Sequence, residues 1–202
     1  MKKLLLIIIL CFYNVLLFSQ DFVFPPELKW WLDEIQKVDE SVSLDKFLFF
    51  EEKLILSDDD PLSYKNKLYP VFKKWNYYGN QFAYYPLRIS LKKQKNGKYS
   101  VEPGDDVSEF CIFNKDETVD YVDFFGSSSR LDSFCWVKDN RITAVGSGSG
   151  KESDEYYFSI YDYFIKEGQC IRKEYVYVVK NPDLSKSKFR WWEQRSDYFI
   201  SE

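Results

Sequence analysis

Residues 109–147 read EFCIFNKDETVDYVDFFGSSSRLDSFCWVKDNRITAVGS, and this stretch decides the fold class. Four short runs rich in aromatic and β-branched residues alternate in it with polar turns. The runs are 110–114, 118–125, 133–138 and 141–146, and the turns are 114–117, 126–130 and 139–140. Such runs, separated by short turn signals, are typical of antiparallel strands joined by hairpins. The stretch therefore predicts an antiparallel β-meander.

The positions of the turns also predict which side chains share a face, because side chains alternate along a strand. A turn centred on Lys115-Asp116 groups Phe110, Ile112, Val119 and Tyr121. A turn at Asp139-Asn140 groups Cys135, Val137, Ile142 and Ala144, and leaves Phe134, Trp136, Thr143 and Val145 on the other face. Both faces of this second hairpin are apolar, so we expect it to be buried on both sides.

The same stretch resembles one blade of a β-propeller of the WD40 or TolB kind, in which a Trp before a short polar turn opens the next strand. The residues that carry the resemblance are FNKDE at 113–117 and WVKDNRITA at 136–144, within about a fifth of the chain. The resemblance implies a meander topology and nothing about partners. The chain is short for the four or more blades of a complete propeller.

Length and composition favour one β-rich globular domain. The chain has 202 residues, of which 45% are hydrophobic and 20% aromatic, and aromatic residues are enriched in strands. Its formal charge is −4, and the absence of a strong basic balance argues against nucleic acid as a partner.

The first residues predict export. Lys2 and Lys3 precede an apolar run that reaches Phe18, and Ser19 is a small residue at a suitable cleavage position. We interpret residues 1–20 as a signal peptide and 21–202 as the domain, in a periplasmic or extracellular protein. Two alternatives stay open: an uncleaved membrane anchor, and lipidation of Cys11, since ILC at 9–11 loosely resembles a lipobox.

Three cysteines follow the predicted signal peptide, namely Cys111, Cys135 and Cys170. Each lies in an apolar strand, where a buried thiol behaves as a small hydrophobe. One disulfide among the three is the alternative, because exported proteins meet oxidising surroundings.

An amphipathic helix is predicted at 26–38, after Pro25-Pro26. Apolar residues recur there at helical spacing, at Leu28, Trp31, Leu32, Ile35 and Val38. We expect this stripe to cover one face of a sheet, and a partner-binding helix is the alternative.

Further strands are predicted on both sides of the central stretch. Residues 43–56 favour a strand, 62–78 a short helix with an aromatic-rich connection, and 83–91 a half-buried strand. The hydrophobic pattern selects a three-residue loop with a left-handed Gly97, which sets Leu91 opposite Val101. Residues 146–150 read as a flexible loop. Strands at 155–166 and 169–180 follow, with Asp162 opposite Lys173, and a last strand is expected at 189–194.

Several catalytic motifs are excluded. The chain has no histidine, which removes histidine-dependent catalysis and the common zinc sites. The run GSGSGK at 146–151 has the wrong spacing for a phosphate-binding loop, and Glu152 stands where Ser or Thr is required. Ser43-x-x-Lys46 and Ser185-x-x-Lys188 lack the companion motifs of penicillin-binding enzymes. The acidic runs at 58–60 and 105–109 are expected to be turns.

Aromatic doublets are the remaining candidates for a site, because adjacent residues of a strand point to opposite faces. One member of each doublet needs a second layer to cover it or forms a binding platform. The predicted ligand-binding residues are Trp30, Tyr78, Tyr84, Tyr157 and Trp191.

The sequence as a whole predicts a mainly β, antiparallel meander, two-layered or open and barrel-like, with an N-terminal amphipathic helix. We expect an exported, non-catalytic binding protein of the bacterial envelope, whose partner is a protein or a glycan. No nucleotide, cofactor, metal or catalytic residue is expected. The alternatives are an exported glycan hydrolase that uses carboxylates and an inhibitor or immunity-type partner protein.

Overall fold

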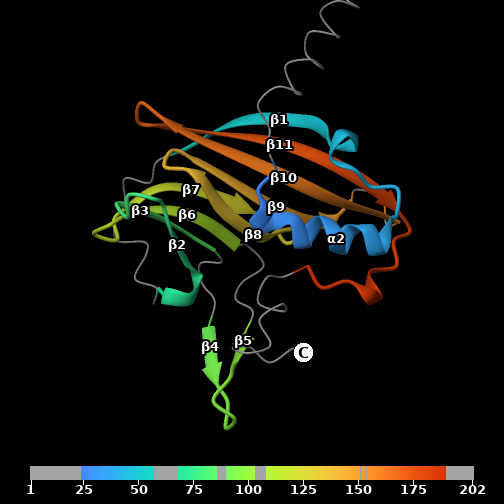
Figure 1. The fold of residues 1–202 in the computed structure, drawn as a ribbon, viewed down its shortest axis with the longest axis horizontal. Helices are drawn as coiled ribbons and strands as arrows, with labels where there is room; N and C mark the ends of the chain where they lie inside the picture. The colour runs from blue at the N-terminus through green and yellow to red at the C-terminus, as the bar shows by residue number, and fades with distance from the viewer. Residues whose placement is uncertain are drawn as a thin grey trace, which may run out of the picture.

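A computed structural model describes residues 24–56, 68–85, 90–102, 108–150, 152 and 154–189. The predictions made for residues 1–20, for the acidic runs at 58–60 and 105–106, for 62–67 and for 190–194 lie outside these ranges. The expected turn at Glu109 is wrong, because Glu109 is buried in the strand Ser108–Asn114. Within them the protein is mainly β with antiparallel sheets and one short N-terminal helix, and the sheets do not form a closed barrel, so the predicted fold class is confirmed (Figure 1).

The larger sheet has five antiparallel strands. Their order across the sheet is β1 (Leu48–Ile55), β11 (Gln169–Lys180), β10 (Glu155–Lys166), β9 (Arg141–Ser149) and β8 (Ser129–Lys138). The predicted pairing of β10 with β11 is confirmed, since Asp162 lies opposite Lys173. Each of these two residues has a different ion-pair partner, however, because Asp162 binds Arg141 at 2.6 Å and Lys173 lies 3.4 Å from Glu52.

The smaller sheet has four strands, in the order β2 (Lys73–Trp75), β3 (Gln81–Tyr84), β6 (Ser108–Asn114) and β7 (Val119–Phe125). A separate hairpin is formed by β4 (Ser90–Lys93) and β5 (Tyr99–Glu102). The three-residue loop is confirmed, because Leu91 pairs with Val101 and Gly97 has a φ of +84°. The single strand predicted at 83–91 is wrong: β3 and β4 belong to different sheets, and Pro86 between them has no N–H for a ladder.

The two main sheets enclose the largest apolar cluster of the described residues, which takes side chains from eight strands. It includes Phe110 of β6, Phe134 and Trp136 of β8, and Tyr161 and Tyr163 of β10. On the opposite face of the five-stranded sheet lies the helix α2 (Lys29–Val38), preceded by the 3-10 turn η1 (Pro26–Leu28) (Figure 1). The predicted amphipathic helix and its role as a cover for the sheet are therefore confirmed.

Trp31 is the centre of the helix contact. Its side chain is buried, and its ring meets Phe158 of β10 edge to face at 6.0 Å between centroids. Its indole Nε1 donates a hydrogen bond of 2.9 Å to Oδ2 of Asp132. Asp132 lies where the β8–β9 pairing shifts register between Leu131 and Ser133. A β-bulge of this kind turns a side chain away from the regular alternation, and here it turns a carboxylate toward the helix.

Two further register shifts correct the predicted faces. In the β6–β7 pair the shift between Ile112 and Phe113 sets Val119 opposite Phe113, so Val119 packs on the outer face of the small sheet. In the β8–β9 pair a second shift, between Trp136 and Lys138, sets Trp136 opposite Ile142. Phe134 and Trp136 therefore share the inner face with Ile142 and Ala144, while Cys135 and Val145 face the helix. Burial on both sides is confirmed.

The propeller resemblance does not extend to the fold. β6 and β7 belong to the four-stranded sheet, whereas β8 and β9 belong to the five-stranded one, so residues 113–144 do not form one blade. The predicted loop at 146–150 is also wrong in part, because β9 continues to Ser149. The strand within 43–56 is confirmed as β1, with the 3-10 turn η2 (Leu44–Lys46) before it.

The remaining described segments are short. The 3-10 turn η3 (Pro70–Phe72) leads directly into β2, and η4 (Leu184–Lys186) follows β11. Cys111, Cys135 and Cys170 are buried and are not joined by disulfides. Within the described ranges, α2 and the other helical segments are too short or too polar to cross a membrane.

Candidate functional site

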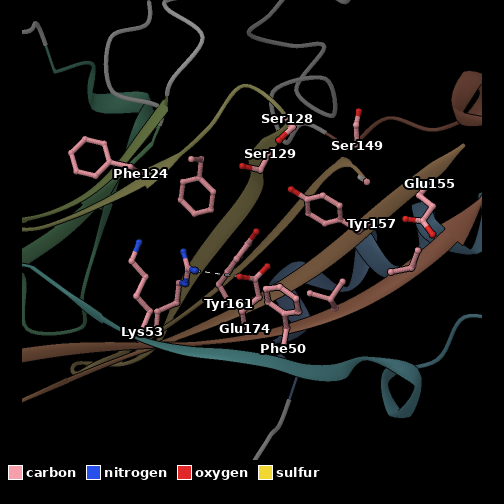
Figure 2. A pocket seen from close by; sticks show the side chains of 15 residues that line it. Phe50, Lys53, Phe124, Ser128, Ser129, Ser149, Glu155, Tyr157, Tyr161 and Glu174 are labelled. Atoms are coloured by element: carbon pink, nitrogen blue, oxygen red, sulfur yellow. Dashed lines mark hydrogen bonds and ion pairs between the residues drawn. The ribbon is translucent and has the colours of Figure 1, made fainter. Parts of the chain in front are cut away.

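A cleft of about 680 Å³ opens on the inner face of the five-stranded sheet (Figure 2). Strands β10 and β11 supply seven of its fifteen lining residues and β1 supplies one wall. The end of β7, the start of β8 and the end of β9 supply the rest. Its lining residues are Phe50, Lys53, Phe124, Phe125, Ser128, Ser129, Ser149, Gly150, Glu155, Tyr157, Tyr161, Arg172, Glu174, Val176 and Val178. This volume is within the range of ~300–1,000 Å³ that is usual for ligand sites.

Alternating glycines on β9 allow large side chains to lie flat on this face. A Cβ atom at Gly148 would lie 2.5 Å from the hydroxyl oxygen of Tyr157, and one at Gly150 would lie 2.4 Å from Cβ of Glu155. At Gly146 the ring of Tyr161 would be 3.0 Å away. The distances at Gly148 and Gly150 are too short for a side chain, and at Gly146 a Cβ atom would also lie 2.3 Å from the backbone oxygen of Arg130. The three glycines of the GSGSG run therefore leave room for the side chains of Glu155, Tyr157 and Tyr161, which lie on one face of β10.

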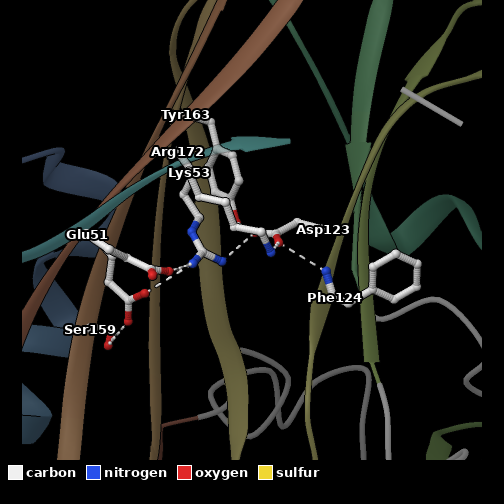
Figure 3. Close-up of polar contacts among 8 residues, drawn as sticks. Glu51, Lys53, Asp123, Phe124, Ser159, Tyr163 and Arg172 are labelled. Carbon is white, nitrogen blue, oxygen red and sulfur yellow. Dashed lines mark hydrogen bonds and ion pairs between the residues drawn. The ribbon is translucent and has the colours of Figure 1, made fainter. Parts of the chain in front are cut away.

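The deeper part of the cleft contains an ion-pair network around Arg172 (Figure 3). Arg172 Nη1 donates to Oδ2 of Asp123 at 2.7 Å, and Nη2 donates to Oε2 of Glu174 at 3.2 Å and to Oε1 of Glu51. Arg172, Asp123 and Glu174 are buried. The network joins β7 of one main sheet to β1 and β11 of the other.

Further contacts hold the carboxylates of this network in place. Tyr163 donates its hydroxyl hydrogen to Oδ2 of Asp123 at 2.9 Å, and Lys53 Nζ lies 3.4 Å from Oδ1 of the same residue. Ser159 donates to Oε1 of Glu174 at 2.9 Å. A buried charge is tolerated when it is paired and hydrogen-bonded, and the three carboxylates and both Nη atoms of Arg172 meet that condition. The buried Nε of Arg172 has no hydrogen-bond partner among the described residues.

Burial determines the direction of the pKa shifts at the site. It raises the pKa of Glu174, although Arg172 and Ser159 act in the opposite direction. Burial, followed by the negative charge of Asp123, raises the pKa of Tyr163 well above its usual range. For Arg172, burial would lower the pKa, but Asp123 and the other anionic partners outweigh it, so the guanidinium stays charged.

The mouth of the cleft has a different chemistry. Three serines, at 128, 129 and 149, lie around the half-buried ring of Tyr157, as Figure 2 shows, and the Tyr157 hydroxyl is hydrogen-bonded to Ser129. Glu155 lies on the same strand, 3.6 Å from the exposed Lys180. Two phenylalanines border the opening with large exposed fractions, 66% for Phe50 and 56% for Phe124. The mouth therefore combines ring faces with hydroxyl groups above an ionic floor.

The five aromatic residues predicted from the sequence do not form one site. Tyr157 lines the cleft. Tyr84 is buried between the small sheet and η3, where its hydroxyl accepts from the Tyr69 backbone N–H at 3.1 Å. Trp30 is half-buried on α2, and Tyr78 is 80% exposed in the β2–β3 turn. Trp191 lies outside the described residues.

Sequence reasoning missed the charged residues of the floor. Asp123, Arg172 and Glu174 occupy alternating strand positions that look like an ordinary solvated face, and Asp123 lies 49 residues from Arg172. The alternate glycines Gly146, Gly148 and Gly150 were the available sign of a site, because glycines inside a strand indicate that other groups approach the backbone closely.

No group of three or more acidic or cysteine side chains that could hold a metal ion occurs within the described ranges. The groups that line the site are aromatic rings, hydroxyl groups and paired charges. Comparison with protein-family models, with curated proteins and with solved structures found no match to this chain.

Proposed function

We propose that the protein is an exported, non-catalytic binding protein of the bacterial envelope, and that its cleft holds a segment of a glycan chain. The observation that carries the proposal is the mouth of the cleft, where Tyr157 and three serines surround an open space. The C–H bonds of a sugar ring are attracted to the negative face of an aromatic ring. Sugar hydroxyls can exchange hydrogen bonds with serine hydroxyls.

The state of the carboxylates supports binding rather than hydrolysis. Glycoside hydrolysis needs one carboxyl group to donate a proton and a second to act as nucleophile or base. In the floor of this cleft, both oxygens of Glu174 accept hydrogen bonds, from Ser159 and from Arg172. Asp123 is held in the same way by Tyr163 and Arg172. These groups neutralise one another and hold the two sheets together.

A carboxylate-dependent glycan hydrolase is the second candidate, and one observation favours it. Glu174 lines the cleft, and burial raises the pKa of its carboxyl group, as a general acid requires. The Glu174→Gln variant separates the two functions. A hydrolase loses its activity on oligosaccharides in this variant, whereas a binding protein shows no turnover in either form.

Binding is tested by calorimetric titration of the purified protein with trisaccharides of glucose, N-acetylglucosamine and glucosamine. The Tyr157→Ala variant removes the ring at the mouth, and Tyr78→Ala is the matched control because Tyr78 lies in the β2–β3 turn outside the cleft. We expect at least one sugar to bind, with binding lost in Tyr157→Ala and kept in Tyr78→Ala. Equal loss in both variants, or no binding to any sugar, would contradict the proposal.

Export is tested by mass spectrometry of the protein from its native cells. The charged start at Lys2-Lys3 and the apolar run after it motivate the expectation that the N-terminus lies near Gln20 or Asp21. Detection of a lipid on Cys11 would indicate an exported protein that is anchored to the membrane. An intact Met1 on protein from the cytoplasm would contradict export.

A further inference from the structure

We propose that the mouth of the cleft recognises a protonated amine, so that the bound glycan carries free amino sugars. This inference rests on the proposed function and specifies its ligand. It is based on two places in the cleft where an aromatic ring of β10 lies on the same face as a carboxylate, one of which already holds a cation of the protein itself.

The first copy of the arrangement is in the floor. The guanidinium carbon of Arg172 lies 5.2 Å from the centroid of the Tyr161 ring and 6.0 Å from that of Phe125. Its Nη2 atom lies 3.2 Å from Oε2 of Glu174. The cation is thus held by the negative face of a ring together with a carboxylate, which is a favourable combination inside a partly desolvated site.

The second copy is at the mouth. Tyr157 precedes Tyr161 by four residues on β10, so both rings lie on the same face of the sheet, and Glu155 lies two residues further on that face. Gly148 and Gly150 make room for Tyr157 and Glu155, as described above. Of the Lys and Arg side chains in the described ranges, none lies over the Tyr157 ring. This ring and its carboxylate face the open cleft.

The charges around the cleft favour a cation over an anion. In the floor, Arg172 and Lys53 are accompanied by three carboxylates, those of Glu51, Asp123 and Glu174. Glu155 adds a further carboxylate at the mouth, and its partner Lys180 is 65% exposed at 3.6 Å. Such an exposed pair is weak and can be replaced by a ligand amine. An anionic ligand would find Lys53 and Arg172 already paired with the carboxylates of the floor, whereas the exposed Glu155 pair leaves a carboxylate that a cation can bind.

The hydroxyl groups distinguish an amino sugar from other amines. Three serines at the mouth provide donors and acceptors around Tyr157, which suits a ligand that carries several hydroxyls next to its ammonium group. A lysine side chain carries an ammonium group without such hydroxyls. The hydroxyl groups at the mouth therefore favour a sugar, and binding of a lysine-containing peptide is an outcome of the test.

The test compares two trisaccharides that differ at one substituent of each sugar, a charged ammonium group or a neutral acetamide: the glucosamine trimer and its fully N-acetylated form. Titrations are made at about pH 6, below the usual pKa range of such amines, and at physiological salt. We expect the glucosamine trimer to bind about fivefold more tightly, as one ion pair with a ring contact provides. In Glu155→Gln the two trimers should bind equally. Glu167→Gln, in the exposed β10–β11 turn, should keep the preference.

Each outcome decides one claim. If neither trimer nor the glucose trisaccharide binds, the proposed glycan function fails together with this inference. If both trimers bind the unmodified protein equally, the glycan function stands and the amine inference is overturned. A loss of preference in Glu167→Gln as large as in Glu155→Gln indicates general attraction to an acidic protein and also overturns it. Tighter, Glu155-dependent binding of a trilysine peptide assigns the site to peptides instead. Circular dichroism of both variants confirms that they are folded.

Discussion

Asp123 on β7 and Arg172 on β11 form a buried ion pair, with 2.7 Å between Oδ2 and Nη1, that joins the two main sheets. Asp123 also accepts from Tyr163 of β10, and Arg172 also binds two glutamates of its own sheet. The pair therefore joins the two sheets at the edge of the cleft, which Arg172 lines.

Removing one partner of this pair should strongly destabilise the protein. In Asp123→Ala, Arg172 and Tyr163 lose a shared acceptor inside the core, and breaking a buried ion pair costs about 3–5 kcal/mol. The free energy of unfolding in urea measures the change. Glu167→Ala is the control, because Glu167 is exposed beside Lys166, and it should change stability by less than about 0.5 kcal/mol. Similar values for the two variants would show that the network contributes nothing.

The glycines of the GSGSG run should tolerate no side chain. In Gly148→Ala the new Cβ would lie 2.2 Å from the backbone oxygen of Ser128 and 2.5 Å from the Tyr157 hydroxyl. Overpacking of this kind costs about 1–3 kcal/mol. Gly126→Ala is the matched control, because its Cβ would meet nothing within 4 Å. The midpoint of thermal unfolding should fall in the first variant and stay nearly constant in the second. Equal unfolding midpoints in Gly148→Ala and Gly126→Ala would contradict the close packing of Tyr157 against Gly148.

Trp136 is expected to be a structural residue. Its ring belongs to the inner apolar cluster, and its Nε1 donates to the backbone oxygen of Lys74 at 2.7 Å, which links β8 to β2. Truncation to Ala should cost about 3–5 kcal/mol, as for large aromatic residues in cores. Trp75→Ala is the comparison, since Trp75 is 44% exposed, and its cost should be clearly smaller. A change within about 0.5 kcal/mol for Trp136→Ala would place this ring outside the core.

Local patterns predicted local structure well. The register of β10 with β11 and the bulged Asn-Gly hairpin follow from turn chemistry and the two-residue alternation, which act between neighbouring segments. The β-bulges were not predictable in this way, because an extra residue in one strand leaves no mark on composition. Each bulge reversed the faces assigned to the residues beyond it, as at Val119 and Trp136.

The candidate site was harder to predict from the sequence than the fold. Of the predicted ring residues that the structure describes, Tyr157 alone lines the cleft. Its environment depends on Gly148 from one neighbouring strand and on Arg172 and Glu174 from the other, and nothing in a single sequence shows which strands are neighbours. Tyr84 shows why a pair of adjacent aromatic residues does not by itself predict a binding surface. Its ring is covered by Phe72 of η3, a segment that precedes it in the chain.

Lys74 predicts a measurable pH dependence of stability. Burial lowers the pKa of this amine to about 8, and its Nζ donates to the backbone oxygen of Phe134. The unfolded chain holds the proton up to its ordinary pKa of 10.5, whereas the folded protein releases it from about pH 8. Between these values the unfolded state binds more protons, so the contribution of Lys74 to stability rises with pH.

Lys74→Met isolates this contribution. Other groups, including the buried thiols of Cys135 and Cys170 with pKa values raised by burial to about 12, destabilise the fold as pH rises above their ordinary range. The Cys170 thiol acts equally in both proteins and cancels in the comparison. Cys135 interacts with the Lys74 charge, so the comparison is made below pH 9.0, the ordinary pKa of that thiol. Unfolding in urea at several pH values should show the unmodified protein becoming more stable relative to Lys74→Met from about pH 8 to 9. A constant difference would contradict the lowered pKa.

Whether the cleft is the binding site is tested most directly by titrating the protein with the glucosamine trimer and following the backbone NMR chemical shifts. We expect the shifts that change to cluster around the mouth of the cleft, at Ser128, Ser149, Glu155 and Tyr157. We also expect the shifts of Tyr77 and Tyr78, in the β2–β3 turn, to stay constant. Changes centred on these two tyrosines or on α2, or no saturable change anywhere, would contradict the assignment of the cleft as the binding site.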